Sequence, residues 1–269
     1  MGTALAWFRD GVKWRLTFAR QYFFLLATFW NGLQLIAAYR RRLPCARAVP
    51  WSRYTLRHPA DRSGLVETIL EIWLDGVYTA DFYAPIDGDV VIDAGANVGL
   101  FSVWLARAKP HCRIVAFEPA PENFKFLTSN IKSASLTNVE AHCGALAERS
   151  GYASINTDAA RSLDYRVSVG GTGQLIRAYS LADALAIAGS ERIALFKIDI
   201  EGSEYGLFTS ATDADLARVS RFAIEYHNHL RPGTCAFVAE RLRATHRVTI
   251  RPSPNAEYGM LYAVRQQAA

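Results

Sequence analysis

The sequence predicts an α/β fold built on a doubly wound, mostly parallel sheet. From Asp89 onward, short apolar segments typical of buried strands alternate with segments whose apolar residues recur at helical spacing. The first of these strands runs directly into a glycine-rich turn at residues 95–99, and a helical pattern follows the turn. Because strand–helix–strand repeats place helices on both faces of a parallel sheet, we expect that architecture here.

The expected elements can be placed along the chain in order. Residues 1–50 predict a helical extension, and residues 51–85 predict a linker followed by a lid helix over 63–73. Residues 86–269 form the main domain, in which the polar, glycine-rich residues 151–178 predict a β-hairpin insertion. We expect strands at 89–94, 113–118, 138–144, 193–200, 221–227, 246–251 and 259–265, and helices at 99–108, 121–132, 180–188, 204–211 and 232–243.

The glycine-rich turn has the pattern Asp93-x-Gly95-x-Asn97-x-Gly99, which differs from the G-x-G-x-x-G pattern of dinucleotide sites. Gly95 would let a ligand approach the backbone, Asn97 tolerates a left-handed turn, and Gly99 would let the helix pack closely on the strand. The carboxylate of Asp93 would repel a pyrophosphate. It suits a ligand with a positive end, such as the amino group or sulfonium of S-adenosylmethionine (SAM).

A second acidic residue supports a nucleoside ligand. Glu118 ends the strand expected at 113–118 and follows Asp93 by 25 residues. A carboxylate at the end of the second strand can accept hydrogen bonds from both hydroxyls of a ribose. The two features together predict a nucleoside cofactor, and the alternative is a pair of carboxylates that only cap turns.

Two later strands each carry ionisable residues at alternate positions, so that each set lies on one face of its strand. Ligand sites in parallel sheets lie at the carboxyl ends of the strands, so these residues and the two carboxylates above predict an active site at one edge. The sets are Lys197, Asp199 and Glu201 in one strand, and Glu225, His227 and His229 in the other.

The chemistry expected of these residues follows from the cofactor. An enzyme that uses SAM must align an acceptor with the methyl group and, for a hydroxyl acceptor, remove a proton. His227 is the expected base because its ordinary pKa is nearest neutrality, and Glu225, Asp199 or Glu201 could orient it or take its place. Lys197 is expected to keep Asp199 ionised. The alternative is a structural network of ion pairs.

The same carboxylates and histidine offer ligands for a divalent metal. Clustered acids more often bond to backbone or substrate, so we expect no metal. His229 and Glu204 are expected to have structural roles, and Tyr78 is expected to pack in the core or to contact a ligand.

Composition limits the classes of partner. The 269 residues carry a formal net charge of +5, and much of the excess lies before residue 63. Such a basic region is more typical of a membrane surface or a solvated face than of nucleic acid, so no nucleic-acid partner is expected. The four cysteines form no C-x-x-C pair, which argues against a zinc site or disulfide framework and favours a reduced, cytoplasmic setting.

Residues 21–39 contain no charged side chain and are rich in aromatic residues, with arginines on both sides. An interfacial helix or re-entrant anchor within residues 14–42, at the inner face of a membrane, fits this better than a clean span. The reason is that Asn31, Gly32 and Gln34 interrupt the apolar run. The alternatives are a helix packed on the main domain and a helix in the dimer interface of an oligomer.

Four segments together resemble the FkbM-type SAM-dependent methyltransferases. They read VIDAGANVGLFS at 91–102, AFEPAPENF at 116–124, FKIDIEGSE at 196–204 and IEYH at 224–227. The third is the most specific, and the resemblance extends from about residue 55 to residue 264. It implies the class I methyltransferase fold, a Rossmann-like doubly wound, mostly parallel seven-stranded sheet with a reversed final strand.

The resemblance also implies O-methylation of a hydroxyl on a sugar, glycolipid or natural product, so the expected partner is a small-molecule or glycan hydroxyl acceptor. By the same resemblance Ala145 lies near the adenine. Asp183 inherits no role, because Leu181-Ala-Asp183 departs from the Leu-Asp-Asp-like sequence expected there. Cofactor contacts are expected from Asp93, Gly95, Ala96, Asn97, Gly99, Glu118, Pro119, Ala145 and Asp199.

Two other classes of function remain open. A non-catalytic SAM-binding or membrane-associated scaffold protein would not need the acid and histidine set, and it predicts that His227→Ala leaves function intact. A nicotinamide enzyme predicts tighter binding of NAD than of S-adenosylhomocysteine (SAH).

Overall fold

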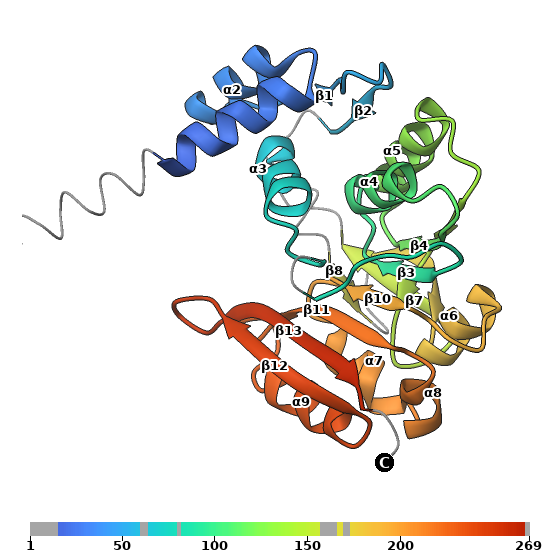
Figure 1. Cartoon of the computed structure of the whole chain (residues 1–269). Helices are drawn as coiled ribbons and strands as arrows, with labels where there is room; N and C mark the ends of the chain where they lie inside the picture. Colours follow the sequence, from blue (N-terminus) through green and yellow to red (C-terminus); the bar gives the residue numbers. More distant parts are fainter. Residues whose placement is uncertain (1–15, 60–63, 80–81, 157–165, 169–172, 267–269) are drawn as a thin grey trace, which may run out of the picture.

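The computed structural model describes residues 16–59, 64–79, 82–156, 166–168 and 173–266 (Figure 1). A seven-stranded sheet lies at the centre, with strand order β12-β13-β11-β10-β3-β4-β5. Neighbouring strands run parallel except at β13, which is antiparallel to both β11 and β12. This confirms the predicted sheet and its reversed final strand. The strands are β3 (Val90–Ala94), β4 (Arg113–Glu118), β5 (Val139–Cys143), β10 (Leu195–Ile198), β11 (Arg221–His227), β12 (His246–Pro252) and β13 (Tyr258–Arg265).

Helices cover both faces of this sheet because successive strand residues point to opposite sides. In β3, Val91 packs with helix α4 and the N-terminal segments, whereas Ile92 packs with the helices of the other face. The central strands β3, β4 and β10 are buried on both faces, which explains their continuous apolar sequences. The first face carries α4 (Leu100–Ala108) and α5 (Pro121–Ser133), and the second carries α6 (Leu181–Ala188), α7 (Glu204–Ser210), α8 (Asp213–Ala217) and α9 (Thr234–Arg243).

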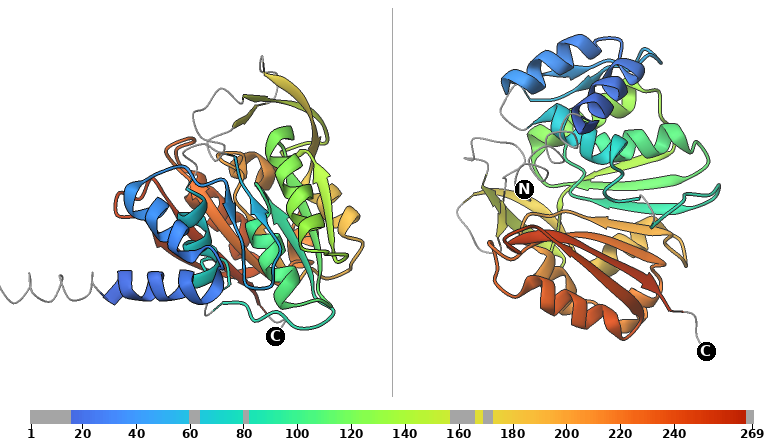
Figure 2. Two further views of the ribbon diagram at one scale, coloured as in Figure 1. Left: turned by 90° about the horizontal axis from the view of Figure 1, so that it is seen from above. Right: turned by 60° about the vertical axis from the view of Figure 1, so that its left-hand side comes forward.

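The insertion predicted as a β-hairpin is larger than a hairpin. It forms a separate four-stranded sheet with the order β6-β9-β7-β8, in which β7 pairs antiparallel with both β8 and β9. Its strands extend away from the large sheet (Figure 2). Residues 157–165 and 169–172 of the predicted hairpin lie outside the described residues. The strands are β6 (Ala145–Leu146), β7 (Gly151–Asn156), β8 (Arg166–Ser168) and β9 (Gln174–Tyr179).

The N-terminal extension, for which an interfacial helix or a re-entrant anchor was expected, contains two helices joined by a turn. Residues 16–28 are helical, residues 29–31 turn, and α2 spans Gly32–Arg41. The side chain of Asn31 bonds the backbone at Arg47 and Val49, which ties the turn to the segment that follows. A Cβ at Gly32 would lie 2.6 Å from the carbonyl oxygen of Leu25, so only glycine allows this close turn.

One side of this helical pair packs on the main domain, as one of the alternatives for residues 21–39 proposed. Leu25, Phe29 and Leu35 are fully buried in the same core as α3, and the ring of Phe29 stacks on Trp73 at 5.4 Å. The right-hand view of Figure 2 shows the N-terminal helices beside the teal helix α3. Among the described residues, no helix is both long enough and apolar enough to cross a bilayer.

The lid helix predicted at 63–73 is present, but it changes its winding part-way. The helix α3 (Leu65–Ile69) continues as one π-helical turn, η1 (Leu70–Leu74). Residue 63 lies outside the described residues. Two short strands, β1 (Arg47–Ala48) and β2 (Leu56–Arg57), pair before it. Single π turns often occur beside functional sites, and this one leads directly to the cavity wall formed by Tyr78.

Candidate active site

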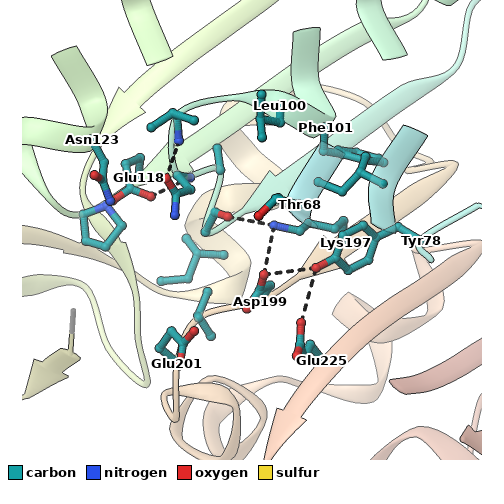
Figure 3. A pocket seen from close by; sticks show the side chains of 18 of the residues that line it. Thr68, Tyr78, Leu100, Phe101, Glu118, Asn123, Lys197, Asp199, Glu201 and Glu225 are labelled. Carbon is teal, nitrogen blue, oxygen red and sulfur yellow. Dashed lines mark hydrogen bonds and ion pairs between the residues drawn. The ribbon is translucent and has the colours of Figure 1, made fainter. Parts of the chain in front are cut away.

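A cavity lies at the carboxyl ends of β3, β4, β10 and β11, where the sequence placed the site (Figure 3). The lid helix and the residues next to it contribute one wall, which includes His58, Thr68 and Tyr78. Most of the predicted site residues line this cavity, but Asp93, Gly99 and His227 do not. The predicted residues that line it are Gly95, Ala96, Asn97, Glu118, Pro119, Ala145, Lys197, Asp199, Glu201 and Glu225.

The glycines of the turn are required by close contacts within the protein, and not only by the space that a ligand would need. A Cβ on Gly95 would lie 1.6 Å from the carbonyl oxygen of Asp199, so glycine is required where the end of β10 crosses the turn. Gly99 starts α4, and a Cβ there would lie 2.5 Å from Leu127 of α5, not against the strand as expected. Both glycines have positive φ, and so has Asn97 at +51°, which confirms the predicted left-handed turn.

Asp93 lies beneath the cavity and not in it. Its side chain is fully buried, accepts a 2.6 Å hydrogen bond from the hydroxyl of Ser102, and lies 3.1 Å from the Lys197 ammonium. Lys197 Nζ also donates to the carbonyl of Gly95 at 2.7 Å and lies 3.8 Å from Asp199. Direct contact between Asp93 and a positively charged ligand, as expected from the sequence, does not fit this arrangement.

Lys197 remains charged despite its burial. Desolvation lowers the pKa of its ammonium, but the carboxylates of Asp93 and Asp199 outweigh that effect and raise the pKa above its ordinary value. The ammonium therefore acts as a fixed positive charge between a buried carboxylate below and the Asp199 carboxylate above, in keeping with the role of counter-ion expected for it.

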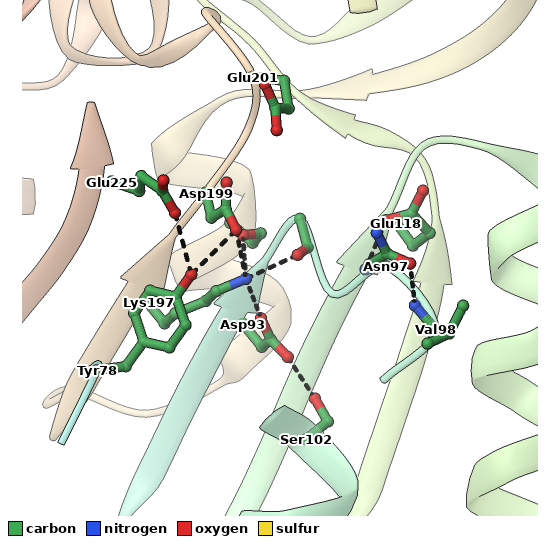
Figure 4. A network of polar contacts seen from close by, with 12 residues as sticks. Tyr78, Asp93, Asn97, Val98, Ser102, Glu118, Lys197, Asp199, Glu201 and Glu225 are labelled. Carbon is green, nitrogen blue, oxygen red and sulfur yellow. Dashed lines mark hydrogen bonds and ion pairs between the residues drawn. The ribbon is translucent and has the colours of Figure 1, made fainter. Parts of the chain in front are cut away.

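Above Lys197, three side chains from distant parts of the chain meet (Figure 4). The Tyr78 hydroxyl donates to Asp199 at 3.0 Å and lies 3.4 Å from Glu225, and its ring lies over the Lys197 ammonium at 5.1 Å. Burial, followed by the charges of Asp199 and Glu225, raises the pKa of Tyr78. Tyr78 therefore keeps its proton and donates a hydrogen bond to Asp199, the nearer of the two acidic groups, with Glu225 also within reach.

The pKa of Glu225 suits a group that accepts a proton from a substrate. Burial, and then the nearby charge of Asp199, raise the pKa of Glu225 to about 8. The two carboxyl groups share the Tyr78 hydroxyl, so a proton on Glu225 relieves the repulsion between them. Glu225 can therefore exchange a proton near neutral pH.

Glu118 lines the far end of the cavity from Glu225. Its carboxylate accepts hydrogen bonds from the backbone N–H groups of Asn97 at 2.7 Å and Ala120 at 2.9 Å, and from the side chain of Asn123 at 3.4 Å. Burial raises the pKa of Glu118 to about 7, although these donors partly offset the shift. The carboxylate is thus held rigidly at the cavity wall, where hydroxyl donors from a ligand would favour its ionised form.

His227 is fixed between two carboxylates. Its Nδ1 donates to Glu204 at 2.8 Å, and its Nε2 lies 3.6 Å from Glu201. Burial alone would lower the pKa of His227, but Glu204 and Glu201 outweigh it and raise the pKa to about 10. The imidazole is therefore protonated at neutral pH. It therefore lacks the free nitrogen that the expected general base needs.

The remaining polar residues near this edge have structural contacts. His229 is exposed and its Nδ1 lies 3.2 Å from the carbonyl of Glu257, and its structural role stays a prediction. Asp183 caps helix α6 together with Ser180 in a reciprocal capping box. Neither residue lines the cavity.

One group of side chains offers ligand atoms for a metal. The ligand atoms of Asp199, Glu201 and His227 lie within 4.8 Å of one another. A metal at this point would have to displace the proton held on His227, whose pKa is raised to about 10. The expectation that no metal takes part stays a prediction.

Comparison with known proteins identifies the family. The family model described as the methyltransferase FkbM domain matches residues 93–247, which is more than half of the chain. The chain belongs to the FkbM methyltransferase family. It is therefore a methyltransferase, and SAM is its methyl donor.

Two relatives in sequence agree with this assignment. Methyltransferase 1 of Beauveria bassiana (strain ARSEF 2860) is 27% identical over 178 residues, which cover 58% of this chain and 70% of the relative. The 31-O-demethyl-FK506 methyltransferase FkbM of Streptomyces tacrolimicus is 27% identical over 190 residues, which cover 59% of this chain and 73% of the relative. Among solved structures, the precorrin-6y C5,15-methyltransferase of Geobacter metallireducens GS-15 has a TM-score of 0.42 at 15% identity, covering 68% of this chain and 82% of that chain.

Sequence reasoning missed the contacts of Tyr78 with Asp199 and of Glu204 with His227. Glu204 ends the FKIDIEGSE segment, so its spacing from Glu201 was a usable signal. Tyr78 lies 121 residues before Asp199, and no local pattern connects the two.

Proposed function

We propose that this FkbM methyltransferase transfers the methyl group to a hydroxyl oxygen of a sugar, glycolipid or natural product, with Glu225 as the general base. The name of the Streptomyces tacrolimicus relative, 31-O-demethyl-FK506 methyltransferase, describes methylation at an oxygen, which supports the choice of acceptor atom. The observation that carries the proposal is a cavity carboxyl group, Glu225, whose pKa is raised to about 8 by burial and by Asp199. A base whose pKa lies near the working pH is efficient at removing a hydroxyl proton.

The residues of the cavity fit SAM. Glu118 offers carboxylate oxygens for ribose hydroxyls, and Pro119 and Ala145 line the neighbouring wall where an adenine would lie. Ala96 and Asn97 bring the backbone of the glycine-rich turn to the cavity. We assign the contact with the cationic end to Asp199, because Asp93 is fully buried beneath Lys197.

The proposed reaction needs one proton transfer by the protein. SAM supplies an activated methyl group, and its transfer leaves a neutral thioether. As the acceptor oxygen forms its bond to the methyl carbon, the hydroxyl proton passes to the Glu225 carboxylate. The Tyr78 hydroxyl steadies the ionised form of Glu225 before the transfer, since it lies 3.4 Å from that carboxylate. His227 stays protonated and holds Glu201 and Glu204 in place.

A screen with methyl-labelled SAM tests the proposal. The purified full chain is incubated with panels of glycans, glycolipids and hydroxylated natural products, and the labelled product is located by mass spectrometry and carbon NMR. We expect the label on an oxygen atom. A product labelled on nitrogen or carbon would overturn the assignment of the acceptor.

The pH dependence then tests the base. For a base with a pKa of about 8, the ionised fraction, and with it kcat/KM, rises about tenfold between pH 7 and pH 9. Glu225→Gln should lose activity by roughly 10²- to 10⁴-fold while SAH affinity stays close to that of the wild type. Glu240→Gln, on the exposed side of α9, is the matched control. Wild-type activity in Glu225→Gln would remove Glu225 from the mechanism.

A further inference from the structure

The N-terminal helical pair has a second side that faces solvent and is strongly apolar. Large apolar side chains recur along it, and two of them are tryptophans. Trp30 at the turn is 66% exposed and Trp51 is 56% exposed. The exposed apolar side chains are Phe23, Leu26, Trp30, Leu33 and Trp51, and we call them the apolar tip.

The members of the apolar tip lie next to one another. The indole N–H of Trp51 donates to the carbonyl of Leu26 at 3.1 Å, and the backbone N–H of Trp30 donates to Val49 two residues before Trp51. Phe23 precedes Leu26 by one helical turn, and Leu33 follows Trp30 by three residues. The tip is thus one surface at the turn of the helical pair and not a set of scattered residues.

This surface is held rigidly by the rest of the protein. The inward side of the pair buries Leu25, Phe29 and Leu35 completely, so the outward apolar side chains are not part of the core. Arg20 further fixes the first helix to the lid segment through an ion pair of 2.8 Å with Asp75. A fixed, exposed apolar surface of this kind marks an interaction site.

The charge around the tip indicates what it binds. Residues 16–58 contain seven arginines and neither aspartate nor glutamate. Three of them, Arg40 to Arg42, end α2, and Arg47 and Arg53 flank the segment that carries Trp51. Tryptophans beside arginines are typical of a surface that enters the headgroup region of an anionic bilayer. A second copy of the chain would bring the same positive charges together, which disfavours self-association through this face.

We propose that the apolar tip and the arginines of residues 40–53 dock on the surface of an anionic lipid bilayer. Phe23, Leu26, Trp30 and Trp51 would enter the interface, and the arginines would contact lipid phosphates. After Trp51 the chain continues through β2 to His58, which lines the active cavity. Docking would therefore hold the cavity wall close to the membrane surface. The proposal does not depend on which atom the enzyme methylates.

Cosedimentation of the full chain with vesicles tests the proposal. We expect binding to vesicles of phosphatidylcholine mixed with phosphatidylglycerol and much weaker binding to phosphatidylcholine alone. Replacing Arg40, Arg41 and Arg42 with glutamine should weaken binding roughly a hundredfold, and Trp30→Ser with Trp51→Ser by about tenfold or more. The matched control is Leu175→Ser on β9, because Leu175 is 67% exposed, as Trp30 is, but lies on the insertion sheet.

Folding of each variant is checked by SAH calorimetry, since the tip lies outside the cavity and SAH affinity should not change. A wild-type chain that stays in the supernatant with the anionic vesicles overturns the proposal. So does a dimer, detected by light scattering, that dissociates in the Trp30→Ser, Trp51→Ser variant, because it would show that a second copy covers the tip. Equal loss of vesicle binding in Leu175→Ser would also overturn it.

Discussion

The protonated state of His227 can be tested without knowing the acceptor. Its pKa in the folded chain is about 10, above the ordinary value of 6.5, because Glu204 and Glu201 outweigh the effect of burial. A group whose pKa is raised on folding stabilises the folded state fully below the unfolded pKa. That stabilisation is lost as the pH rises through the folded pKa. His227 should therefore stabilise the protein at pH 6.5 and lose this effect towards pH 10.

The size of this stability change follows from the pH range between the unfolded and the folded pKa of His227. Between pH 7 and pH 9 the folded chain holds one proton on His227 that the unfolded chain has released. The free energy of unfolding then falls by about 1.36 kcal/mol per pH unit, or about 2.7 kcal/mol over the interval. The reference is the double variant Glu204→Gln, His227→Gln, which removes both partners of the 2.8 Å ion pair and leaves no uncompensated buried charge.

Urea denaturation at pH 7, 8 and 9 measures the effect. The stability advantage of the wild type over the double variant should shrink by about 2.7 kcal/mol from pH 7 to pH 9. His246→Gln is the matched control, because His246 is equally buried but burial lowers its pKa, so it titrates below this interval. Parallel stability curves for the wild type and the double variant would refute a protonated His227 and restore it as a candidate base.

Three further predictions can be checked by calorimetry and denaturation. Glu118→Ala should weaken SAH binding by on the order of a hundredfold, through the loss of two hydrogen bonds to a charged acceptor. Wild-type affinity should rise with pH through about 7, the pKa of Glu118, whereas pH-independent affinity would contradict this. Gly95→Ala should destabilise the fold by about 3 kcal/mol or more, while Gly88→Ala, with a similar positive φ and open space, should cost about 1 kcal/mol. Mg²⁺ should give no saturable heat at pH 7, because His227 holds its proton; a saturable site would show that metal displaces it.

The architecture could be predicted from the sequence because, in the main domain, the pattern of each short segment agrees with the element that it forms in the fold. Each central strand is a short apolar run, and each run is followed by a turn and a helical pattern, so the order of elements needed no tertiary information. The location of the site followed for the same reason. Residues that directly follow parallel strands share one edge, and Glu118, Asp199, Glu201 and Glu225 all line the cavity there.

What the sequence could not provide were contacts between segments that are distant in the chain. Whether residues 21–39 form one helix or a turn between two could not be decided, because the turn depends on the bonds of Asn31 to the backbone at Arg47 and Val49. Periodicity alone cannot reveal such a partner. The role of base was assigned to His227 from its ordinary pKa. The two carboxylates that raise that pKa come from the loop after β10 and from α7, so the shift exists only in the folded chain.

The charged side chains of the site differ in how deeply they are buried. This difference decides how the effect of replacing each one should be interpreted. Asp93 is fully buried, the Lys197 side chain is 4% exposed and the Asp199 side chain is 25% exposed. Removing Asp93 would leave a buried ammonium without its closest charged partner, which is costly in a way that removing an exposed charge is not. Loss of activity in an Asp93 variant would thus report a disturbed Lys197 and glycine-rich turn. Of these two carboxylates only Asp199 lines the cavity, so an Asp199 variant tests the contact with the cofactor that we propose for it.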